Sequence, residues 1–527
     1  MIGRRTILAG AAAAAVPLRA RAQPAPARVL RYVPQADLGS IDPIWTTSVV
    51  TRDHGFLIYD TLFGTDANFQ PTPQLAEGHS LEQDGRVCTV RLRTGLKFHD
   101  GEAIRARDGV ASLERWMVRA PLGQKLKSVL DELSAPDDLT IRFRLKRPLP
   151  YLVPMLGLPA TPVPFIMPER VARTDPFQQI TDTTGSGPFR YLAQEHIPGS
   201  FSAYAPFAGY SPTPAGGTGL TAGPKLTHFD RIEWHTLPDA ATAAAALQRG
   251  EMDWFCQPPP EVLELLRRSR GISVGPLDLL PYTLLLRFNS LNPPFDNAAI
   301  RRALLPAIDQ ADFVAACVGN NPEAGITGTG VFPAGSPSAS DAGLEPLRGP
   351  RSMDLARQRL KEAGYDGGLV RVLGPTDILN PSALTQVGID LFRRLGMNLD
   401  VQLTDWASVV QRRPNKEPVE RGGWSASFYS NPGFDLLNPA TNALLRGNGA
   451  GAWFGWPTIP RLEELRENWF DTADPAAQAA ITREMQVVAM RELPFIPLGG
   501  LRNFTATRAD LRDRVVGSPI FWNLKRA

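Results

Sequence analysis

Residues 73–117 of this chain read PQLAEGHSLEQDGRVCTVRLRTGLKFHDGEAIRARDGVASLERWM, and this stretch decides the fold. Apolar and polar residues alternate over 88–92, which is typical of a strand with one buried face. The dipeptides Asp84-Gly85 and Asp100-Gly101 supply residues that tolerate the positive φ of tight turns. Apolar residues then recur at helical spacing over 110–117. The stretch therefore predicts a hairpin followed by a helix.

Working outward, residues 139–145 (LTIRFRL) alternate in the same way and predict a second strand of this small unit. Residues 229–255 predict a strand, a Leu-Pro-Asp turn, a helix and another strand. Asp239 suits the N-cap of that helix, and Gly250 suits the left-handed residue that ends it. This succession of strands and helices is typical of an α/β protein.

Further along, residues 282–309 predict a buried strand, a turn and a helix that must break at Pro306, where Asp309 can cap a new helix. Residues 352–365 predict a helix capped by Ser352 and ended by a glycine. The Gly- and Pro-rich segment 205–224 predicts a surface loop.

The length of 527 residues is too great for one hydrophobic core and predicts two or three lobes. An apolar content of 43% and a charged content of 21% are those of an ordinary soluble globular protein. Residues 1–22 carry four arginines and no acid, so the net charge falls from +3 to −1 without them. That balance excludes the strongly basic character of a nucleic-acid-binding protein.

The first 22 residues predict a signal peptide. Arg4-Arg5 precede an apolar stretch, Ile7–Leu18, that is too short to span a bilayer, and Ala20-Arg21-Ala22 suits cleavage before Gln23. The adjacent arginines favour twin-arginine export, and a Sec signal is the alternative. No cysteine follows the apolar stretch, so we expect a soluble periplasmic protein without a lipid anchor. The three cysteines of the chain (Cys88, Cys256 and Cys317) do not specify a disulfide.

These motifs, in this order along the whole mature chain, resemble the family 5 extracellular solute-binding proteins. Those proteins are the oligopeptide, dipeptide and nickel binding subunits of ABC importers. The resemblance implies an α/β fold like that of the type II periplasmic binding proteins. Two lobes would be joined by two crossing strands, near 282–289 and 492–499, with an extra inserted subdomain. The expected division is a signal peptide at 1–22, a first lobe at 23–64, 186–283 and 494–527, the inserted subdomain at 65–185, and a second lobe at 284–493.

The resemblance also implies the function. The protein would capture a peptide or peptide-like small solute between its lobes and deliver it to permease subunits in the inner membrane, acting as a monomer. No bond is broken, so neither a catalytic group nor a cofactor is expected. A chemosensory receptor on the same fold is an alternative that shares every sequence feature. A secreted hydrolase is another, but the chain contains no P-loop or dinucleotide fingerprint.

The segment 404–429 (TDWASVVQRRPNKEPVERGGWSASFY) is where the resemblance places most of the ligand contacts. Arginine suits a ligand carboxylate through its bidentate fork, although a solvated loop is the alternative for Arg412 and Arg413. Aromatic side chains suit apolar pocket walls, although core packing is the alternative for each of them. The predicted ligand-binding residues are Trp45, Phe288, Asn289, Trp406, Arg412, Arg421, Trp424, Ser427, Phe428 and Tyr429.

One position departs from the family pattern. Peptide-binding members carry an aspartate three residues after the tryptophan that Trp424 resembles, and that carboxylate pairs with the peptide's α-amino group. Here the position is Ser427, and a hydroxyl cannot neutralise a desolvated ammonium. Either the ligand lacks a free α-amine, which we expect, or Asp405 or Asp435 substitutes.

A metal site is not expected. The six histidines form neither an HExxH motif nor a close pair with a cysteine. Nickel as a transported ligand is an alternative that comes only from the family, since transition metals favour histidine ligation.

Overall fold

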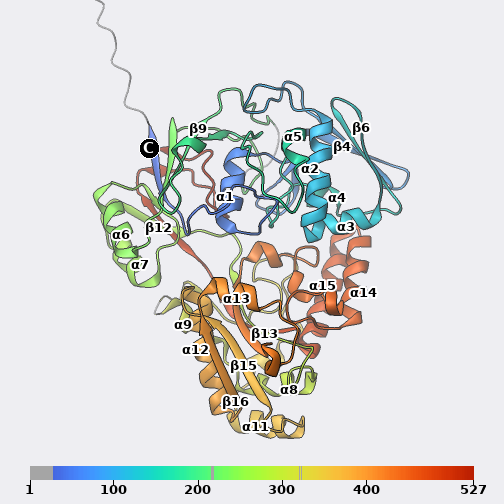
Figure 1. The fold of residues 1–527 in the computed structure, drawn as a ribbon, viewed down its shortest axis with the longest axis vertical. Coiled ribbons are helices and arrows are strands. Elements are labelled where there is room, and N and C mark those ends of the chain that lie inside the picture. Colours follow the sequence, from blue (N-terminus) through green and yellow to red (C-terminus); the bar gives the residue numbers. More distant parts are fainter. Residues whose placement is uncertain (1–27, 215–218, 320, 322) are drawn as a thin grey trace, which may run out of the picture.

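The computed structural model describes residues 28–214, 219–319, 321 and 323–527. The predicted signal peptide, 1–22, and part of the predicted loop 205–224 lie outside these ranges. Three main sheets divide the described chain into a first lobe, an inserted subdomain and a second lobe (Figure 1). No helix of the described residues has the length and apolar character needed to cross a membrane.

The first lobe is built on a seven-stranded mixed sheet. Its central strand pairs in parallel with both neighbours, and the remaining pairs are antiparallel. As predicted, Asp239 accepts a hydrogen bond from the Thr242 amide at the helix start, and Gly250 ends that helix with φ of 77°. In order across the sheet the strands are β12 (Ile272–Pro276), β19 (Phe504–Arg508), β11 (Trp254–Phe255), β1 (Val29–Val33), β10 (Arg231–His235), β9 (Phe201–Pro206) and β8 (Phe189–Tyr191). Its helices are α1 (Val49–Ile58), α6 (Ala240–Arg249) and α7 (Pro260–Arg267).

The strands and the helix predicted within the inserted subdomain are confirmed. Val90 lies opposite Ile141 in the antiparallel register, and both side chains are buried. A helix covers this face so closely that a Cβ on Gly109 would lie 2.4 Å from Ile141. The sheet has the order β4 (Ala76–Glu82), β5 (Val87–Leu92), β7 (Thr140–Leu145) and β6 (Leu130–Asp137). The helices are α2 (Ala106–Arg119), α3 (Pro121–Val129), α4 (Leu152–Met155) and α5 (Glu169–Ala172).

The second lobe is built on a six-stranded sheet in the order β14-β18-β13-β17-β15-β16. The predicted helix break is confirmed, because the helix before Pro306 ends at Ala303 and Asp309 caps the next one. The strands are β13 (Tyr282–Phe288), β14 (Gly325–Ile326), β15 (Leu369–Pro375), β16 (Asn398–Thr404), β17 (Ala426–Asn431) and β18 (Phe495–Leu501). The helices are α8 (Ala298–Ala303), α9 (Gln310–Val318), α10 (Glu345–Arg348), α11 (Met353–Glu362), α12 (Leu379–Arg394), α13 (Trp406–Arg412), α14 (Pro460–Asp471) and α15 (Pro475–Glu492).

Short two-stranded ribbons complete the described chain. They pair β2 (Phe63–Thr65) with β3 (Pro71–Pro73) and β20 (Leu511–Arg512) with β21 (Lys525–Arg526). The described part of the predicted surface loop 205–224 is not wholly exposed. Thr221 is buried and accepts a hydrogen bond of 2.9 Å from the Thr65 amide, so the loop folds back onto the ribbon.

The first passage between the lobes lies earlier in the chain than the sequence predicted, and the second lies later. β18 lies in the sheet of the second lobe, where it pairs with β13, although the expected boundary assigned residues 494–527 to the first lobe. The predicted crossings near 282–289 and 492–499 are therefore strands of the second lobe. The chain passes between the lobes at 277–281 and at 502–503, because β12 and β19 pair with each other in the first lobe.

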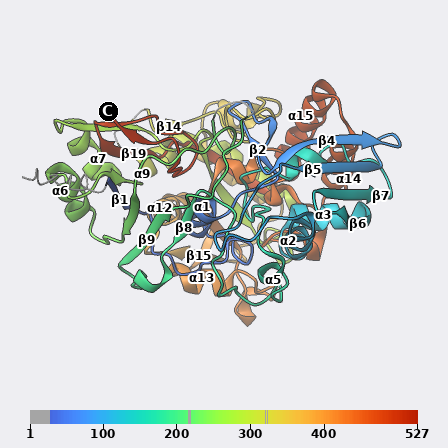
Figure 2. The ribbon, with the colours of Figure 1, turned by 90° about the horizontal axis from the view of Figure 1, so that it is seen from above.

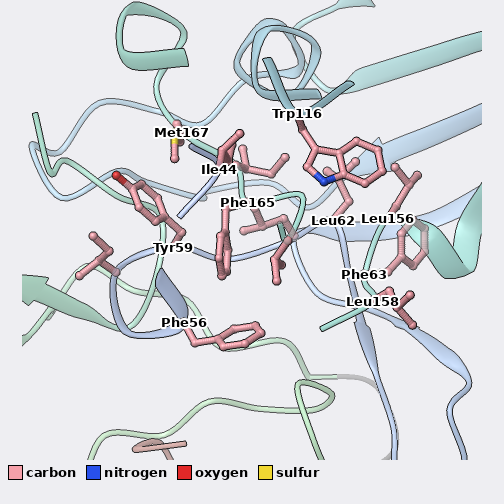
Figure 3. Packing of buried hydrophobic residues seen from close by; sticks show 14 of the residues in the cluster. Ile44, Phe56, Tyr59, Leu62, Phe63, Trp116, Leu156, Leu158, Phe165 and Met167 are labelled. Carbon is pink, nitrogen blue, oxygen red and sulfur yellow. The ribbon is translucent and has the colours of Figure 1, made fainter. Parts of the chain in front are cut away.

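The first lobe and the inserted subdomain share one hydrophobic core, which also includes Phe434, Leu437, Ala440, Trp469 and Phe470 of the second lobe, and the second lobe has a further core of its own. Figure 3 shows Phe165 of the inserted subdomain beside Phe56 of α1 and Tyr59 just after it, with ring centroids 5.1 and 5.9 Å away. Trp116 of α2 belongs to the same cluster. A shared core fixes the inserted subdomain to the first lobe, so these two parts act as one body.

Candidate ligand-binding site

A cavity of about 630 Å³ lies between the two bodies and is walled by both of them. The first lobe contributes residues 46–49, at the start of α1. The inserted subdomain contributes residues of α2, α3 and α4 and the loop around Pro162. The second lobe contributes α13 and the segment that follows β17. The site therefore changes shape whenever the two bodies move relative to each other.

Much of the cavity wall is apolar. Trp116, Met155 and Leu158 come from the inserted subdomain, and Trp406 and Trp453 come from the second lobe. The Trp116 indole donates a 2.7 Å hydrogen bond to the Pro162 carbonyl, which fixes the ring in the wall. Such a surface favours a ligand with a sizeable apolar part.

Arg413 contributes a positively charged side chain to the cavity wall. Its guanidinium lies among the rings of Trp406, Trp453 and Phe454, with its central carbon 5.8, 5.6 and 4.5 Å from their centroids. The buried Nε atom has no hydrogen-bond partner among the described residues. Burial lowers the pKa of Arg413, and only the Tyr429 hydroxyl opposes that shift. A guanidinium held in this way favours an incoming anion.

Asp435 is the carboxyl group of the cavity, and it follows β17 by four residues. Its Oδ1 atom is buried without a hydrogen-bond partner in the described chain. Burial raises the pKa of Asp435, and the positive charge of Arg52 opposes the shift. Arg52 itself donates to Asp53 at 3.1 Å and to Ser518 at 3.0 Å, so it does not form a direct ion pair with Asp435. A hydrogen bond from the Thr161 backbone also opposes the shift, so of the two carboxyl oxygens Oδ1 is the one left without a partner among the described residues.

The start of α1 adds backbone donors. The N-cap residue Ser48 makes no side-chain cap, and the first turn contains no acidic residue. The first amides of a helix have no partner within the helix and carry a partial positive charge. The wall formed by residues 46–49 thus suits carbonyl or carboxylate oxygens.

Among the predicted site residues, Trp406 lines the cavity. Tyr429 lies behind the wall, with ring centroids 5.3 Å from Trp453 and 6.2 Å from Trp406. Trp424 is buried and donates a 3.0 Å hydrogen bond to the Arg413 carbonyl. These two residues support the cavity residues and do not line the cavity themselves.

The predicted residues of the central strands are structural. The Ser427 hydroxyl donates to the Leu373 carbonyl at 2.8 Å inside the sheet. Phe428 packs against α12, where a Cβ on Gly388 would lie 1.9 Å from its ring. Phe288 is fully buried. Asn289 is also buried, and its amide donates to the Trp424 carbonyl at 3.0 Å.

The remaining predicted residues lie away from the cavity wall. Arg412 donates to the Gln402 side chain. Arg421 is 72% exposed and pairs with Glu417 at 3.0 Å. The Trp45 indole donates to the Phe177 carbonyl at 3.3 Å.

Arg413 was considered beside Arg412 but was not among the predicted ligand-binding residues, and Trp453 was not predicted at all, although a signal for Arg413 was present. Trp406, Val410 and Arg413 are spaced by four and three residues, which places them on one face of α13. Arg412 falls on a neighbouring face. Of the two carboxylates considered as substitutes, Asp435 lines the cavity, whereas Asp405 caps α13 by accepting from the Ser408 amide.

Within the described ranges, no three His, Cys, Asp or Glu side chains are grouped so that they could hold a metal ion.

Comparisons with known proteins point to one family. Residues 70–443 match the model of the bacterial extracellular solute-binding proteins, family 5. The chain is 33% identical over 525 residues to the probable peptide ABC transporter periplasmic-binding protein y4tO of Sinorhizobium fredii (strain NBRC 101917 / NGR234), covering 99% of this chain and 98% of that protein. It is 27% identical over 483 residues to the glutathione-binding protein GsiB of Escherichia coli (strain K12), covering 87% and 86%.

Solved structures share the fold. The dipeptide binding protein from Pseudoalteromonas sp. SM9913 in complex with Met-Leu has a TM-score of 0.76 at 19% identity, covering 95% of this chain and 100% of that chain. The periplasmic binding protein AgaA of A. tumefacien R10 in complex with agropinic acid has a TM-score of 0.77 at 20% identity, covering 95% and 98%. The family match extends over most of the chain, and the y4tO similarity extends over nearly all of it. This chain therefore belongs to the family 5 bacterial extracellular solute-binding proteins.

Proposed function

We propose that this protein is the periplasmic substrate-binding subunit of an ABC importer. It encloses a peptide or peptide-like small solute between its lobes and delivers it, as a monomer, to permease subunits in the inner membrane. The observation that carries the proposal is the cavity walled by both bodies, with Arg413 and Asp435 exposed to it. Family membership and the name of the y4tO relative support the same function.

The charges of the cavity favour a zwitterionic ligand. Arg413 would receive a carboxylate, and Asp435 would receive an ammonium group, because both side chains line the cavity. This assignment favours the second of the alternatives drawn from Ser427, in which a nearby aspartate replaces the family's strand aspartate. Met-Leu and glutathione, bound by the relatives named above, carry both kinds of group.

The size of the cavity favours a short ligand. A volume of about 630 Å³ lies within the range of about 300–1,000 Å³ that is usual for enclosed small-molecule sites. The apolar wall around Trp116 and Leu158 would receive one bulky side chain. A long peptide would have to leave part of its chain outside the closed lobes.

The proposal is tested by identifying the solute that co-purifies. Protein exported to the periplasm is purified without denaturation and examined by native mass spectrometry. The expected result is a stoichiometric small molecule that raises the melting temperature when it is added back to stripped protein. Turnover of that molecule, or a complex with a large partner in its place, would contradict the proposal.

The ligand class is tested with a panel of four Met-Leu derivatives, namely the free dipeptide, its N-acetyl form, its C-terminal amide and the doubly blocked form. The free dipeptide should raise the melting temperature most, and each block should reduce the shift because one buried charge loses its partner. Equal shifts with the free and N-acetyl forms would show that Asp435 does not receive an amine.

A further inference from the structure

Ion pairs join the inserted subdomain to the second lobe beside the cavity. Glu467 of α14 pairs with Lys125 of α3 and, at 3.0 Å, with Arg147. Arg147 also pairs with Asp471 at the end of the same helix. Figures 1 and 2 both place α3 next to α14. One carboxylate on the second lobe is therefore held by two cations of the inserted subdomain.

Burial strengthens the central pair. The Lys125 side chain is only 6% exposed, whereas that of Glu467 is 46% exposed. Burial lowers the pKa of Lys125, and its hydrogen bond to Glu467 opposes the shift. The Lys125 ammonium also lies 4.8 Å from the centroid of the Phe470 ring, again on α14. Loss of Glu467 would leave a partly desolvated cation with little compensation.

Uncharged contacts join the same two parts of the molecule. We call this junction between the inserted subdomain and the second lobe the seam. The Asn438 amide donates a 2.8 Å hydrogen bond to the Tyr151 hydroxyl, and the Tyr151 ring packs edge-on against Trp469 at 4.8 Å. Tyr151 belongs to the inserted subdomain, and its partners belong to the second lobe. Charged and uncharged contacts thus join the same two bodies.

The seam lies directly behind the cavity wall. Leu122 lines the cavity, and Lys125 follows it by three residues on α3. Met155 lines the cavity, and Tyr151 precedes it by four residues. When Lys125 binds Glu467, the helix that carries Leu122 is held over the cavity.

The two sides of the seam are only partly packed against each other. A second cavity of about 260 Å³, lined by Tyr151, Asn438 and Trp469, lies beside the apolar contacts that Trp469 and Phe470 make with the inserted subdomain. Polar contacts around an incompletely filled space are typical of interfaces between parts that separate. The Arg147 and Glu467 side chains are 38% and 46% exposed, so this ion pair can be exchanged for hydration at modest cost when the bodies move apart.

We propose that Glu467 is a positioning residue that latches the inserted subdomain onto the second lobe and sets how long the ligand stays enclosed. The inference rests on the proposed function for its ligand, but the latch itself is a property of the chain without ligand. It stabilises the closed arrangement only, and it therefore shifts the balance between the open and closed forms. Ligand release is slowed by a side chain that never contacts the ligand.

The latch is tested first without ligand. Spin labels are attached to cysteines introduced at the exposed positions Lys127 of α3 and Glu464 of α14, and the distance between them is measured by pulsed electron paramagnetic resonance. Glu467→Gln should move population from the short distance to longer ones. Asp131→Asn is the matched control, because it breaks an ion pair with Arg144 inside the inserted subdomain. The control should leave the distances unchanged.

The second readout is release of the Met-Leu probe in stopped-flow experiments. Glu467→Gln should raise the dissociation rate about tenfold and leave the association rate within about twofold, as expected when a contact made only after encounter is lost. Salt at about 1 M should raise the dissociation rate of the native protein but have less effect on the variant. A variant that loses only melting temperature would show a merely structural role.

The outcomes separate the two proposals. If Met-Leu and the rest of the panel do not bind the native protein, the proposed ligand class fails while the ligand-free distances still test the latch. If Glu467→Gln leaves both the distances and the release rate unchanged, the latch is overturned. The latch would also be overturned if Glu467→Gln and Asp131→Asn shifted the spin-label distances to longer values by the same amount.

Discussion

Asn503 and Asp278 are hydrogen-bonded to each other across the two segments that connect the lobes. The Asn503 amide donates to the Asp278 carboxyl at 2.8 Å. Each residue belongs to one of the passages between the sheets, at 277–281 and at 502–503. This bond ties the passages together at the point where the lobes must bend relative to each other.

The stability of the protein should depend on pH through Asp278. Burial raises the pKa of Asp278 to about 7, and the Asn503 hydrogen bond opposes the shift. In the unfolded chain this group ionises near pH 4, so between about pH 4 and 7 the unfolded state releases its proton first. The free energy of unfolding should therefore fall as pH rises through this window.

The measurement is the melting temperature at several pH values for the native protein and Asp278→Asn. Between pH 5 and about pH 7, the melting temperature of Asp278→Asn should fall less than that of the native protein. Asp131→Asn, which also removes one carboxylate but from an exposed ion pair, should keep the native slope. Parallel curves for the native protein and Asp278→Asn would contradict the assignment.

Arg413→Met should weaken ligand binding strongly. The substitution removes the cation that faces the cavity but keeps a flexible apolar chain among the three rings. We expect the affinity for Met-Leu to fall on the order of 100-fold, about 2.7 kcal/mol, as is usual when one partner of a buried charge pair is lost. Isothermal titration calorimetry measures the change.

The neighbouring residue provides the control for this prediction. Arg412→Met removes the same charge one position away, where the side chain bonds to Gln402 and does not line the cavity. Its affinity should stay within about threefold of the native value. The same loss in both variants would indicate a general effect of charge.

Trp424→Ala should destabilise the protein by about 3–5 kcal/mol. The side chain is 1% exposed and packs with Leu373, Val409 and Trp456, so its removal leaves a cavity in the second lobe. Chemical denaturation followed by fluorescence measures the loss. Trp424→Phe should retain most of the stability but lose the hydrogen bond to the Arg413 carbonyl, and any change in affinity should therefore be indirect.

The cysteines should not react in the native protein. Cys88, Cys256 and Cys317 are free and buried. Burial raises the pKa of the Cys88 and Cys317 thiols to about 12 and raises that of Cys256 further, which suppresses the reactive thiolate. Ellman's reagent should detect no thiol in the folded protein and all three in denaturant. One rapid thiol before unfolding would contradict this expectation.

Local sequence signals predicted much of the fold correctly. The alternation over 88–92, the Asp239 and Gly250 helix ends and the break at Pro306 were all confirmed, because each depends on residues within a few positions of one another. The boundary of the second lobe was misplaced for the opposite reason. β18 belongs to that lobe through its pairing with β13, which lies about two hundred residues earlier in the chain.

The candidate site was harder to predict, because β17 lies in the middle of its sheet with both faces covered. Ser427 and Phe428 therefore point into packed interiors, and the residues that meet the cavity come after the strand ends. That placement follows the general rule that ligands bind beyond the carboxyl ends of sheet strands. Asp435 lies in this position, four residues after the end of β17.

The sequence by itself determined the family and the order of strands and helices, because these depend on local periodicity, turn residues and motifs in series. Only the tertiary structure decided which side chains meet between the lobes. Thr46, Trp116, Arg413 and Asp435 are far apart in the chain and come together in one cavity through the packing of two bodies. The same packing placed Glu467 against Lys125, a contact between residues more than three hundred positions apart that no local pattern encodes.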